Sequence, residues 1–351
     1  MEKKFMTGNE AIAEAAVQAG CKYFFGYPIT PQSELPEYLA WRLPEVEGCF
    51  LQAESEIAAI YMVFGAAGAG ARVMTSSSSP GISLKQEGIS YIAGAELPCL
   101  IVNIMRGGPG LGGIQPSQSD YFQATKGGGH GDYHPIVIAP STVQEAVDLT
   151  MEAFDLADKY RTPVMILGDG ILGQMMEPVE FKKRKTQLLQ KKDWTLTGAK
   201  GRPRRIIKTL YLQPEILEKR NLTLQRKYRE ITENEVRVET YLIEDAEIII
   251  VAYGTVARIA KTAIKILREK GIRVGMVRPI TLFPFPHPTF AQISDKIGKM
   301  LVVEMNMGQM LEDVKLGVCG KATVYFHGRT GGMVPSYDEI VTEVEKIVKE
   351  A

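Results

Sequence analysis

Short apolar segments alternate with helical stretches along residues 1–181 of this chain. The first helix is expected to begin at a capping box formed by Thr7 and Glu10. Alternating strands and helices build a parallel sheet that is covered by helices on both faces. The pattern therefore predicts an α/β fold, with strands at residues 23–25, 49–51, 72–75, 100–105, 136–139 and 164–167, and helices between them that include 56–67, 84–93 and 143–159.

A second strand–helix pattern begins near Glu247 and predicts another α/β unit. Its expected strands are residues 248–251, 273–277, 300–303 and 322–326, with helices at 255–270 and 336–349. Charged residues dominate between the two patterns, and helical spacing with alternating charges covers 222–240. We therefore predict three parts: a domain at residues 1–181, a charged linker at 182–243 and a second domain at 244–351.

Composition argues against several classes of protein. Lys plus Arg and Asp plus Glu balance at 41 each, which favours a solvated linker over a nucleic-acid patch for the basic runs. No apolar run reaches the roughly 20 residues of a membrane span, and no secretion signal is recognisable, so we expect a cytoplasmic protein. The four cysteines form no C-x-x-C pair, so this chain alone is not expected to hold an iron–sulfur cluster or structural zinc.

The segment Gly26-Tyr27-Pro28-Ile29-Thr30-Pro31 joins the end of a predicted strand to a predicted helix. Thr30 suits the N-cap of that helix and Pro31 its first position. Open α/β sheets bind ligands at such carboxyl ends of strands. A rigid loop with a capped helix explains the same residues equally well.

Two other strand ends carry polar residues. The run from Thr75 to Gly81 offers hydroxyls and backbone amides that could bind a ligand or cap the next helix. Glu54 and Glu56 precede an apolar helix, where carboxylates favour the N-terminus. Glu56 leads directly into apolar residues, so a buried carboxylate that shares a proton is the alternative.

A glycine-rich run, Gly108 to Gly113, satisfies G-x-G-x-x-G after a predicted strand. The residues that follow do not resemble a helix, and no carboxylate stands about 20 residues further on at a strand end, which disfavours a dinucleotide site. We expect a mobile loop beside a pocket, with Arg106 at its base. The Arg106 guanidinium could bind a carboxylate or form a structural ion pair.

Together these segments resemble the α subunit of 2-oxoacid:ferredoxin oxidoreductases, thiamine diphosphate enzymes whose active site is shared by several chains. The resemblance rests on residues 26–31, 53–56, 75–81, 105–109, 118–120, 278–286 and 304–309. The chain is most similar to the branched-chain (3-methyl-2-oxobutanoate) type, through residues 76–80 and 126–132. The resemblance implies a thiamine diphosphate-binding-like parallel sheet domain, which binds the pyrimidine, followed by a transketolase C-terminal-like α/β domain.

The resemblance also implies roles for individual residues. Glu56 would hydrogen-bond the aminopyrimidine ring of thiamine diphosphate and so act as the catalytic residue. Thr30 and Arg106 would contact the 2-oxoacid. The other expected cofactor contacts are Tyr27, Pro28, Ile29 and Ser78.

Metal and cluster sites are expected on other chains. Gly168-Asp169-Gly170 resembles the start of the metal-diphosphate signature of thiamine diphosphate enzymes, but the Asn that completes it is missing, so Asp169 is interpreted as a turn residue. We expect no metal ligand here, with Mg²⁺ and iron–sulfur clusters on partner subunits. The expected partners are a thiamine diphosphate-binding β subunit, a γ subunit and a ferredoxin-like iron–sulfur subunit, together with the 2-oxoacid and coenzyme A.

The implied reaction is CoA-dependent oxidative decarboxylation of a 2-oxoacid to acyl-CoA and CO₂, with reduction of ferredoxin. Three alternatives stay open at this point. The substrate could be pyruvate or 2-oxoglutarate, since relatives specific for them share much of the motif set. The chain could be a non-catalytic structural subunit, or part of a transketolase-like carboligase with no redox step.

Overall fold

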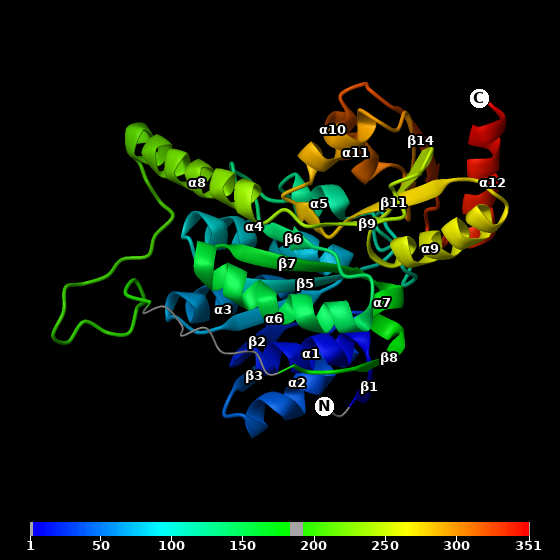
Figure 1. The fold of residues 1–351 in the computed structure, drawn as a ribbon. Helices are drawn as coiled ribbons and strands as arrows, with labels where there is room; N and C mark the ends of the chain where they lie inside the picture. Colours follow the sequence, from blue (N-terminus) through cyan, green and yellow to red (C-terminus); the bar gives the residue numbers. More distant parts are fainter. Residues whose placement is uncertain (1–2, 183–191, 351) are drawn as a thin grey trace.

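The computed structural model describes residues 3–182 and 192–350, and Figure 1 shows their arrangement. Within these residues the larger sheet has seven strands in the order β12-β6-β7-β5-β4-β2-β3. All neighbouring strands run parallel except β12, which is antiparallel to β6. The strands are β2 (Tyr23–Gly26), β3 (Cys49–Gln52), β4 (Val73–Ser77), β5 (Cys99–Met105), β6 (Ile136–Ile138), β7 (Pro163–Asp169) and β12 (Thr281–Phe283).

Helices lie against both faces of this sheet (Figure 1). Helix α1 packs against α2 and α6, while α3 packs against α4. The capping box at the start of α1 is confirmed, because the Thr7 hydroxyl accepts from the Glu10 N–H and the Glu10 carboxylate accepts from the Thr7 N–H. The helices are α1 (Gly8–Gln18), α2 (Glu34–Glu45), α3 (Glu56–Gly68), α4 (Ser79–Gly94), α5 (Tyr121–Thr125), α6 (Val143–Tyr160) and α7 (Gly170–Gln174).

The second sheet has five strands within the described part of the chain, in the order β14-β13-β10-β11-β9. Helices α9 and α12 pack together, and so do α10 and α11. The elements are β9 (Val238–Tyr241), β10 (Ile248–Val251), β11 (Val274–Pro279), β13 (Lys299–Glu304), β14 (Thr323–Gly328), α9 (Gly254–Glu269), α10 (His287–Ser294), α11 (Gln309–Val318) and α12 (Tyr337–Lys349). A small antiparallel pair, β1 (Lys4–Thr7) and β8 (Met176–Val179), lies beside α1.

The segment expected as a charged linker contains regular structure. Helix α8 (Pro214–Asn234) projects from the body of the protein in Figure 1 and ends earlier than the spacing over 222–240 indicates. Strand β9 follows and pairs antiparallel with β11, so residues 238–241 belong to the second sheet. Val238 and Thr240 are β-branched and Tyr241 is aromatic, residue types that suit a strand once a partner strand is present. The division at residues 181 and 243 stays a prediction.

The two halves of the chain are joined through strand β12. It comes from the second half of the sequence, yet Thr281 and Phe283 pair with Ile138 and Val137 at the edge of the first sheet. The Thr281 hydroxyl also accepts from the main-chain N–H of Arg237 at 2.9 Å. The two sheets are therefore not built from two separate stretches of sequence.

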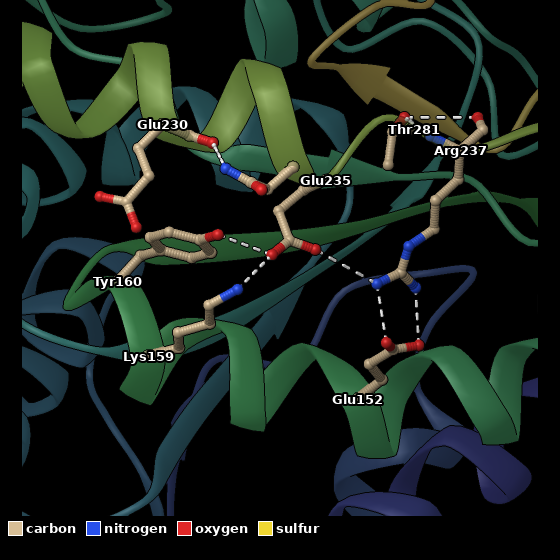
Figure 2. A network of polar contacts seen from close by, with 8 residues as sticks. Glu152, Lys159, Tyr160, Glu230, Glu235, Arg237 and Thr281 are labelled. Atoms are coloured by element: carbon tan, nitrogen blue, oxygen red, sulfur yellow. Dashed lines mark hydrogen bonds and ion pairs between the residues drawn. The ribbon is translucent and has the colours of Figure 1, made fainter.

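Figure 2 shows a polar network that attaches the end of α8 to α6. The buried carboxylate of Glu235 accepts hydrogen bonds from Lys159 Nζ and Tyr160 Oη, each at 2.7 Å. Arg237 forms a bidentate pair with Glu152, at 2.6 and 2.7 Å, and reaches Glu235 at 3.6 Å. The planar guanidinium suits such a two-point contact. The network thus holds the chain between α8 and β9 against the first domain.

A second ion-pair group, centred on Arg278, binds the second sheet to helix α6. Its side chain is only 3% exposed. Its guanidinium pairs with Glu145 at the start of α6, at 2.5 and 3.0 Å, and with Glu239 of β9, at 2.6 Å. Arg278 belongs to the segment 278–286 on which the family resemblance rests, and its contacts give that segment a structural role.

The segments 118–120 and 304–309 also meet at the boundary between the sheets. The N–H of Gln118 donates to the Met305 carbonyl and the Met305 N–H donates to Gln118 Oε1, both at 3.0 Å. Asn306 Nδ2 donates to the Gln118 carbonyl at 2.8 Å. These bonds fix the second domain over the end of the first. None of the described helices has the length and apolar character needed to cross a membrane.

Candidate active site

The polar residues singled out in the sequence lie at the carboxyl ends of the parallel strands β2, β4 and β5 and at the starts of α3 and α4. Parallel strands bring these ends to one edge of the sheet, where helix N-termini present free N–H groups. Glu56 occupies the first position of α3 and is 7% exposed. Ser77 ends β4, and Ser78 is the N-cap of α4.

Glu56 and Ser77 both approach α4 at Gly81, which has no side chain to keep them away. A Cβ atom at Gly81 would lie 2.8 Å from Glu56 Oε1 and 2.1 Å from Ser77 Oγ, so both side chains border the space that the glycine leaves free. The approach requires a residue without a side chain on this face of α4. The structure thus places the Glu56 carboxylate beside the serine run, which the sequence could only present as separate motifs.

Several buried polar atoms at this edge have no hydrogen-bond partner. They are Gln32 Nε2, Ser77 Oγ, Ser78 Oγ and Arg106 Nε. Unpaired buried donors are costly, so four of them at the edge of the sheet that also carries Glu56 indicate a polar ligand. Hydroxyl and carboxylate groups of this kind match the ring nitrogen and amino group of an aminopyrimidine. The residues present therefore fit the pyrimidine half of thiamine diphosphate.

Arg106 follows β5 and is 7% exposed. Its Nη1 donates to the Thr30 carbonyl at 2.9 Å, and its main-chain N–H donates to Ser79 Oγ at 3.0 Å. The structure shows no carboxylate paired with this guanidinium among the described residues, while Nε has no partner. Arg106 and Thr30, both expected to contact substrate, are thus brought together.

Thr30 is not the N-cap of the helix that follows, so that expectation is wrong. The Gln32 N–H donates to the Ile29 carbonyl at 3.2 Å and closes a turn that contains Thr30. Helix α2 then begins only at Glu34, after Ser33. The Gln32 side chain is buried and accepts a hydrogen bond from Ser76 Oγ at 2.5 Å, which holds the turn against the end of β4.

A pocket of about 590 Å³ opens beside this turn. The glycine-rich loop lies next to it, as expected, because Ile114, Gln115 and Pro116 at the end of that loop belong to its lining. No helix follows the loop directly, which agrees with the rejection of a dinucleotide site. The remaining lining residues come from the turn, from α7 and from the second domain: Thr30, Pro31, Ser33, Glu34, Gly170, Ile171, Gln174, Gly332 and Val334.

Tyr27, Pro28 and Ile29, also expected to contact the cofactor, do not line the 590 Å³ pocket. Tyr27 and Pro28 line a smaller cavity of about 220 Å³ together with Phe50 and Gln52. Ile29 is half-buried, and its carbonyl accepts the turn hydrogen bond described above. Their roles toward the cofactor stay predictions.

Asp169 caps a short helix instead of lying in a simple turn. Its Oδ1 accepts from the N–H groups of Ile171 and Leu172, and Oδ2 accepts from the Thr255 hydroxyl at 2.5 Å. Burial raises the pKa of this carboxyl group, and these hydrogen bonds oppose the rise. Among the residues that the structure describes, no group of three or more His, Cys, Asp or Glu side chains could hold a metal ion.

Lys85 is a residue that the sequence analysis missed. It is fully buried in α4, one helical turn after Gly81, and donates to Thr75 and Ser76. The sequence could have indicated that Lys85 is buried, because it stands three residues after Ile82 and four before Ile89, on the apolar face of the helix. A lysine on such a face is rarely buried without a paired charge or a function.

Gly81→Ala tests whether this close approach matters. We expect turnover to fall by roughly 100-fold, because the new methyl group displaces the Glu56 carboxylate and the Ser77 hydroxyl from their places. The measurement is the rate of the assembled enzyme, with circular dichroism to confirm folding. Gly65→Ala is the control, since a Cβ at that exposed position of α3 meets nothing within 4 Å. Wild-type turnover of Gly81→Ala would contradict the assignment of this site.

Residues 14–244 match the sequence family described as pyruvate flavodoxin/ferredoxin oxidoreductase, thiamine diphosphate-binding. Residues 246–340 match pyruvate:ferredoxin oxidoreductase core domain II. The chain belongs to the 2-oxoacid:ferredoxin oxidoreductase family. Its first part is accordingly the thiamine diphosphate-binding domain of that family, and the family resemblance inferred from the sequence motifs is confirmed.

Relatives within the 2-oxoacid:ferredoxin oxidoreductases cover the whole chain. It is 49% identical over 351 residues to ketoisovalerate oxidoreductase subunit VorB of Methanothermobacter marburgensis, which covers 100% of this chain and 99% of that one. It is 38% identical over 375 residues to 2-oxoglutarate synthase subunit KorA of Methanothermobacter thermautotrophicus, with 99% of each covered. Both relatives are named as subunits of larger enzymes.

Solved structures confirm the expected fold class. The chain is similar to 2-oxoglutarate:ferredoxin oxidoreductase from Magnetococcus marinus, with a TM-score of 0.85 and 27% identity over 98% of this chain and 65% of that one. That structure has 2-oxoglutarate, coenzyme A and succinyl-CoA bound. A split gene transketolase, an inactive β4 tetramer, matches with a TM-score of 0.64 and 15% identity over 98% of both chains, which shows the fold alone. A thiamine diphosphate-binding-like domain is thus followed by a transketolase C-terminal-like domain.

Proposed function

We propose that this chain is the α subunit of an enzyme that oxidatively decarboxylates branched-chain 2-oxoacids, 3-methyl-2-oxobutanoate above all, to acyl-CoA and CO₂ with reduction of ferredoxin. The observation that carries the substrate class is the 49% identity, along the full chain, to a ketoisovalerate oxidoreductase subunit. Ketoisovalerate is another name for 3-methyl-2-oxobutanoate. The lower identity of 38% to a 2-oxoglutarate synthase subunit makes that acid the second candidate.

Glu56 is assigned the central role on this chain. Its buried carboxylate lies at the N-terminus of α3, beside the Ser77 hydroxyl, which has no hydrogen-bond partner, and would exchange a proton with the pyrimidine nitrogen. Ser77 and Ser78, whose hydroxyls have no partner, are proposed to hydrogen-bond the same ring. Thiamine diphosphate, when bound, supplies the carbon nucleophile for the 2-oxo group and accepts the electron pair left when CO₂ departs.

Arg106 and Thr30 are assigned to the substrate. The Arg106 guanidinium has a free donor, Nε, in a buried position, and a carboxylate is the ligand that its planar fork suits best. The hydrogen bond from Nη1 to the Thr30 carbonyl holds both residues at one side of the site. Tyr27, Pro28 and Ile29 are proposed to complete the wall toward the cofactor.

The remaining parts of the reaction are assigned to other chains. Ferredoxin accepts single electrons, so the enzyme needs iron–sulfur clusters, and the four cysteines of this chain are all unpaired and scattered. We assign the clusters and Mg²⁺ to partner subunits: a thiamine diphosphate-binding β subunit, a γ subunit and a ferredoxin-like subunit. The cytoplasmic location expected from the sequence stays part of this proposal.

The proposal is tested with the native complex. We expect CoA-dependent reduction of a viologen dye under anaerobic conditions, fastest with 3-methyl-2-oxobutanoate and slower with 2-oxoglutarate or pyruvate. Faster reduction with one of the latter two acids would overturn the substrate assignment. If none of the three acids reduces the dye, the oxidoreductase proposal fails. If the partner subunits alone decarboxylate 2-oxoacids at the full rate, the chain is a structural subunit.

A further inference from the structure

The ammonium group of Lys85 is held beneath the Glu56 site by two strong acceptors. Its Nζ donates to Thr75 Oγ1 at 2.8 Å and to the Ser76 carbonyl at 2.9 Å. The Thr75 hydroxyl in turn donates to the Phe25 carbonyl at 2.6 Å. Lys85 therefore connects α4 to the end of β4 and, through Thr75, to the end of β2. The residues proposed to bind the cofactor and substrate lie at these strand ends. An ammonium group has three donors, so two bonds hold it and one remains.

Glu56 is the charged group that acts on Lys85. Burial lowers the pKa of Lys85 to about 7, and the negative charge of Glu56 opposes that shift. Lys85 stands four residues after Gly81, so both face the same side of α4. The Glu56 carboxylate of α3 borders Gly81 and therefore lies on that side as well. The described residues form no ion pair with Lys85. A buried cation without such a pair is expensive, which points to a function.

We propose that Lys85 is a positioning residue for Glu56: its ammonium group, anchored by Thr75 and Ser76, supplies the positive charge that orients the Glu56 carboxylate toward the cofactor. The proposal rests on the function proposed for Glu56 and extends it to a residue that touches neither cofactor nor substrate. With a pKa of about 7, Lys85 is protonated in part at neutral pH, and its protonated form attracts the Glu56 carboxylate in a buried setting that water screens little. Gly81 leaves room for the Glu56 carboxylate at this face of α4, since a Cβ atom there would lie 2.8 Å from Glu56 Oε1.

The test uses the assembled complex, with Lys85→Met made alone and in a Glu56→Gln background. Methionine keeps the length and apolar stem of lysine but removes the charge and both hydrogen bonds. Lys85→Met is expected to lower kcat by roughly 100-fold and to weaken binding of thiamine diphosphate, measured by calorimetric titration, while KM for the 2-oxoacid is unchanged. In the Glu56→Gln background it should cause no further loss of kcat.

The outcomes separate the two proposals. An equal loss of kcat in both backgrounds, or unchanged kcat and cofactor affinity in Lys85→Met, would overturn the positioning role. Wild-type activity of Glu56→Gln would instead remove the role assigned to Glu56. Lys227→Met is the matched control. Lys227 of α8 is another largely buried lysine, 11% exposed, and it donates to the Glu96 carboxylate and to the Arg161 carbonyl. It should lose thermal stability but keep its kcat, and an equal loss of kcat would also overturn the proposal.

A second pair of variants keeps the test valid if Lys85→Met does not fold. Thr75→Val removes one anchor of the ammonium group with almost no change in side-chain shape, whereas Thr75→Ser retains the hydroxyl. We expect Thr75→Val to lower kcat and cofactor affinity, and Thr75→Ser to keep both near the wild-type values. Equal behaviour of the two variants would overturn the positioning role.

Discussion

Replacing Glu56 with glutamine lowers the turnover of the assembled enzyme by roughly 100-fold to 10,000-fold. Glutamine has the size and shape of glutamate, so the packing against Gly81 and the start of α3 is retained. It carries neither the negative charge nor an oxygen that can hold a proton, and it therefore cannot exchange a proton with the pyrimidine nitrogen. The measurement is viologen reduction with saturating 2-oxoacid, coenzyme A and thiamine diphosphate.

Glu54 provides the matched control for this experiment. It lies two residues before Glu56 and is exposed, so Glu54→Gln makes the same chemical change outside the site. We expect Glu54→Gln to turn over at the wild-type rate. Circular dichroism and subunit co-purification establish that both variants fold and assemble. Equal rates for Glu56→Gln and Glu54→Gln would refute the assignment of Glu56.

Arg278→Met is expected to lower the free energy of unfolding by about 3–5 kcal/mol. The substitution leaves Glu145 and Glu239 without the cation that they share. Glu239 keeps the Lys261 ammonium group at 2.5 Å. Among the described residues, the Glu145 carboxylate keeps only Ser141, which donates through its N–H and its hydroxyl. Chemical denaturation at pH 7 measures the loss. Arg273→Met is the control, because Arg273 pairs with Glu247 at the fully exposed surface and should change nothing measurable.

The effect of Arg278→Met should depend on pH. Burial by itself raises the pKa of Glu145, but the hydrogen bonds and charge of Arg278 outweigh it and hold the pKa below its ordinary value of 4.5. For Glu239, burial is likewise outweighed by Lys261 and Arg278. A lowered carboxyl pKa stabilises the folded state above about pH 4.5, and this stabilisation is lost as the pH falls further. The wild-type and variant unfolding curves should therefore converge below pH 4.5, and a constant difference would contradict this account.

Local sequence signals predicted the parts of the fold that depend on neighbouring residues. The capping box that opens α1 is formed by residues three apart, Thr7 with Glu10, and it is present. The six parallel strands of the first sheet were expected from short apolar runs, which buried parallel strands require. Glu56 could be found because it begins an apolar helix directly after a strand.

The sequence was less informative where distant segments decide the conformation. The start of α4 at Ser79 was expected at residue 84, because Ser, Pro and Gly also suit a turn, and only packing against β5 and Asp120 shows otherwise. Thr30 lies in a turn for a similar reason, since the bond from Ser76 to Gln32 joins segments far apart in the chain. Strands β9 and β12 are short and depend on partners that no local pattern reveals.

Strand β12 has a consequence for how the chain folds as it is made. Ile136, Val137 and Ile138 form a fully apolar strand whose outer edge is paired only when Thr281 to Phe283 arrive. At about 5–20 residues per second, the ribosome needs roughly 7–30 s to produce the intervening chain. During that time a nascent first domain exposes an unpaired hydrophobic edge, which is a template for pairing with another chain. We expect such nascent chains to be substrates for ribosome-associated chaperones, and the gene to tolerate poorly any break placed between β6 and β12.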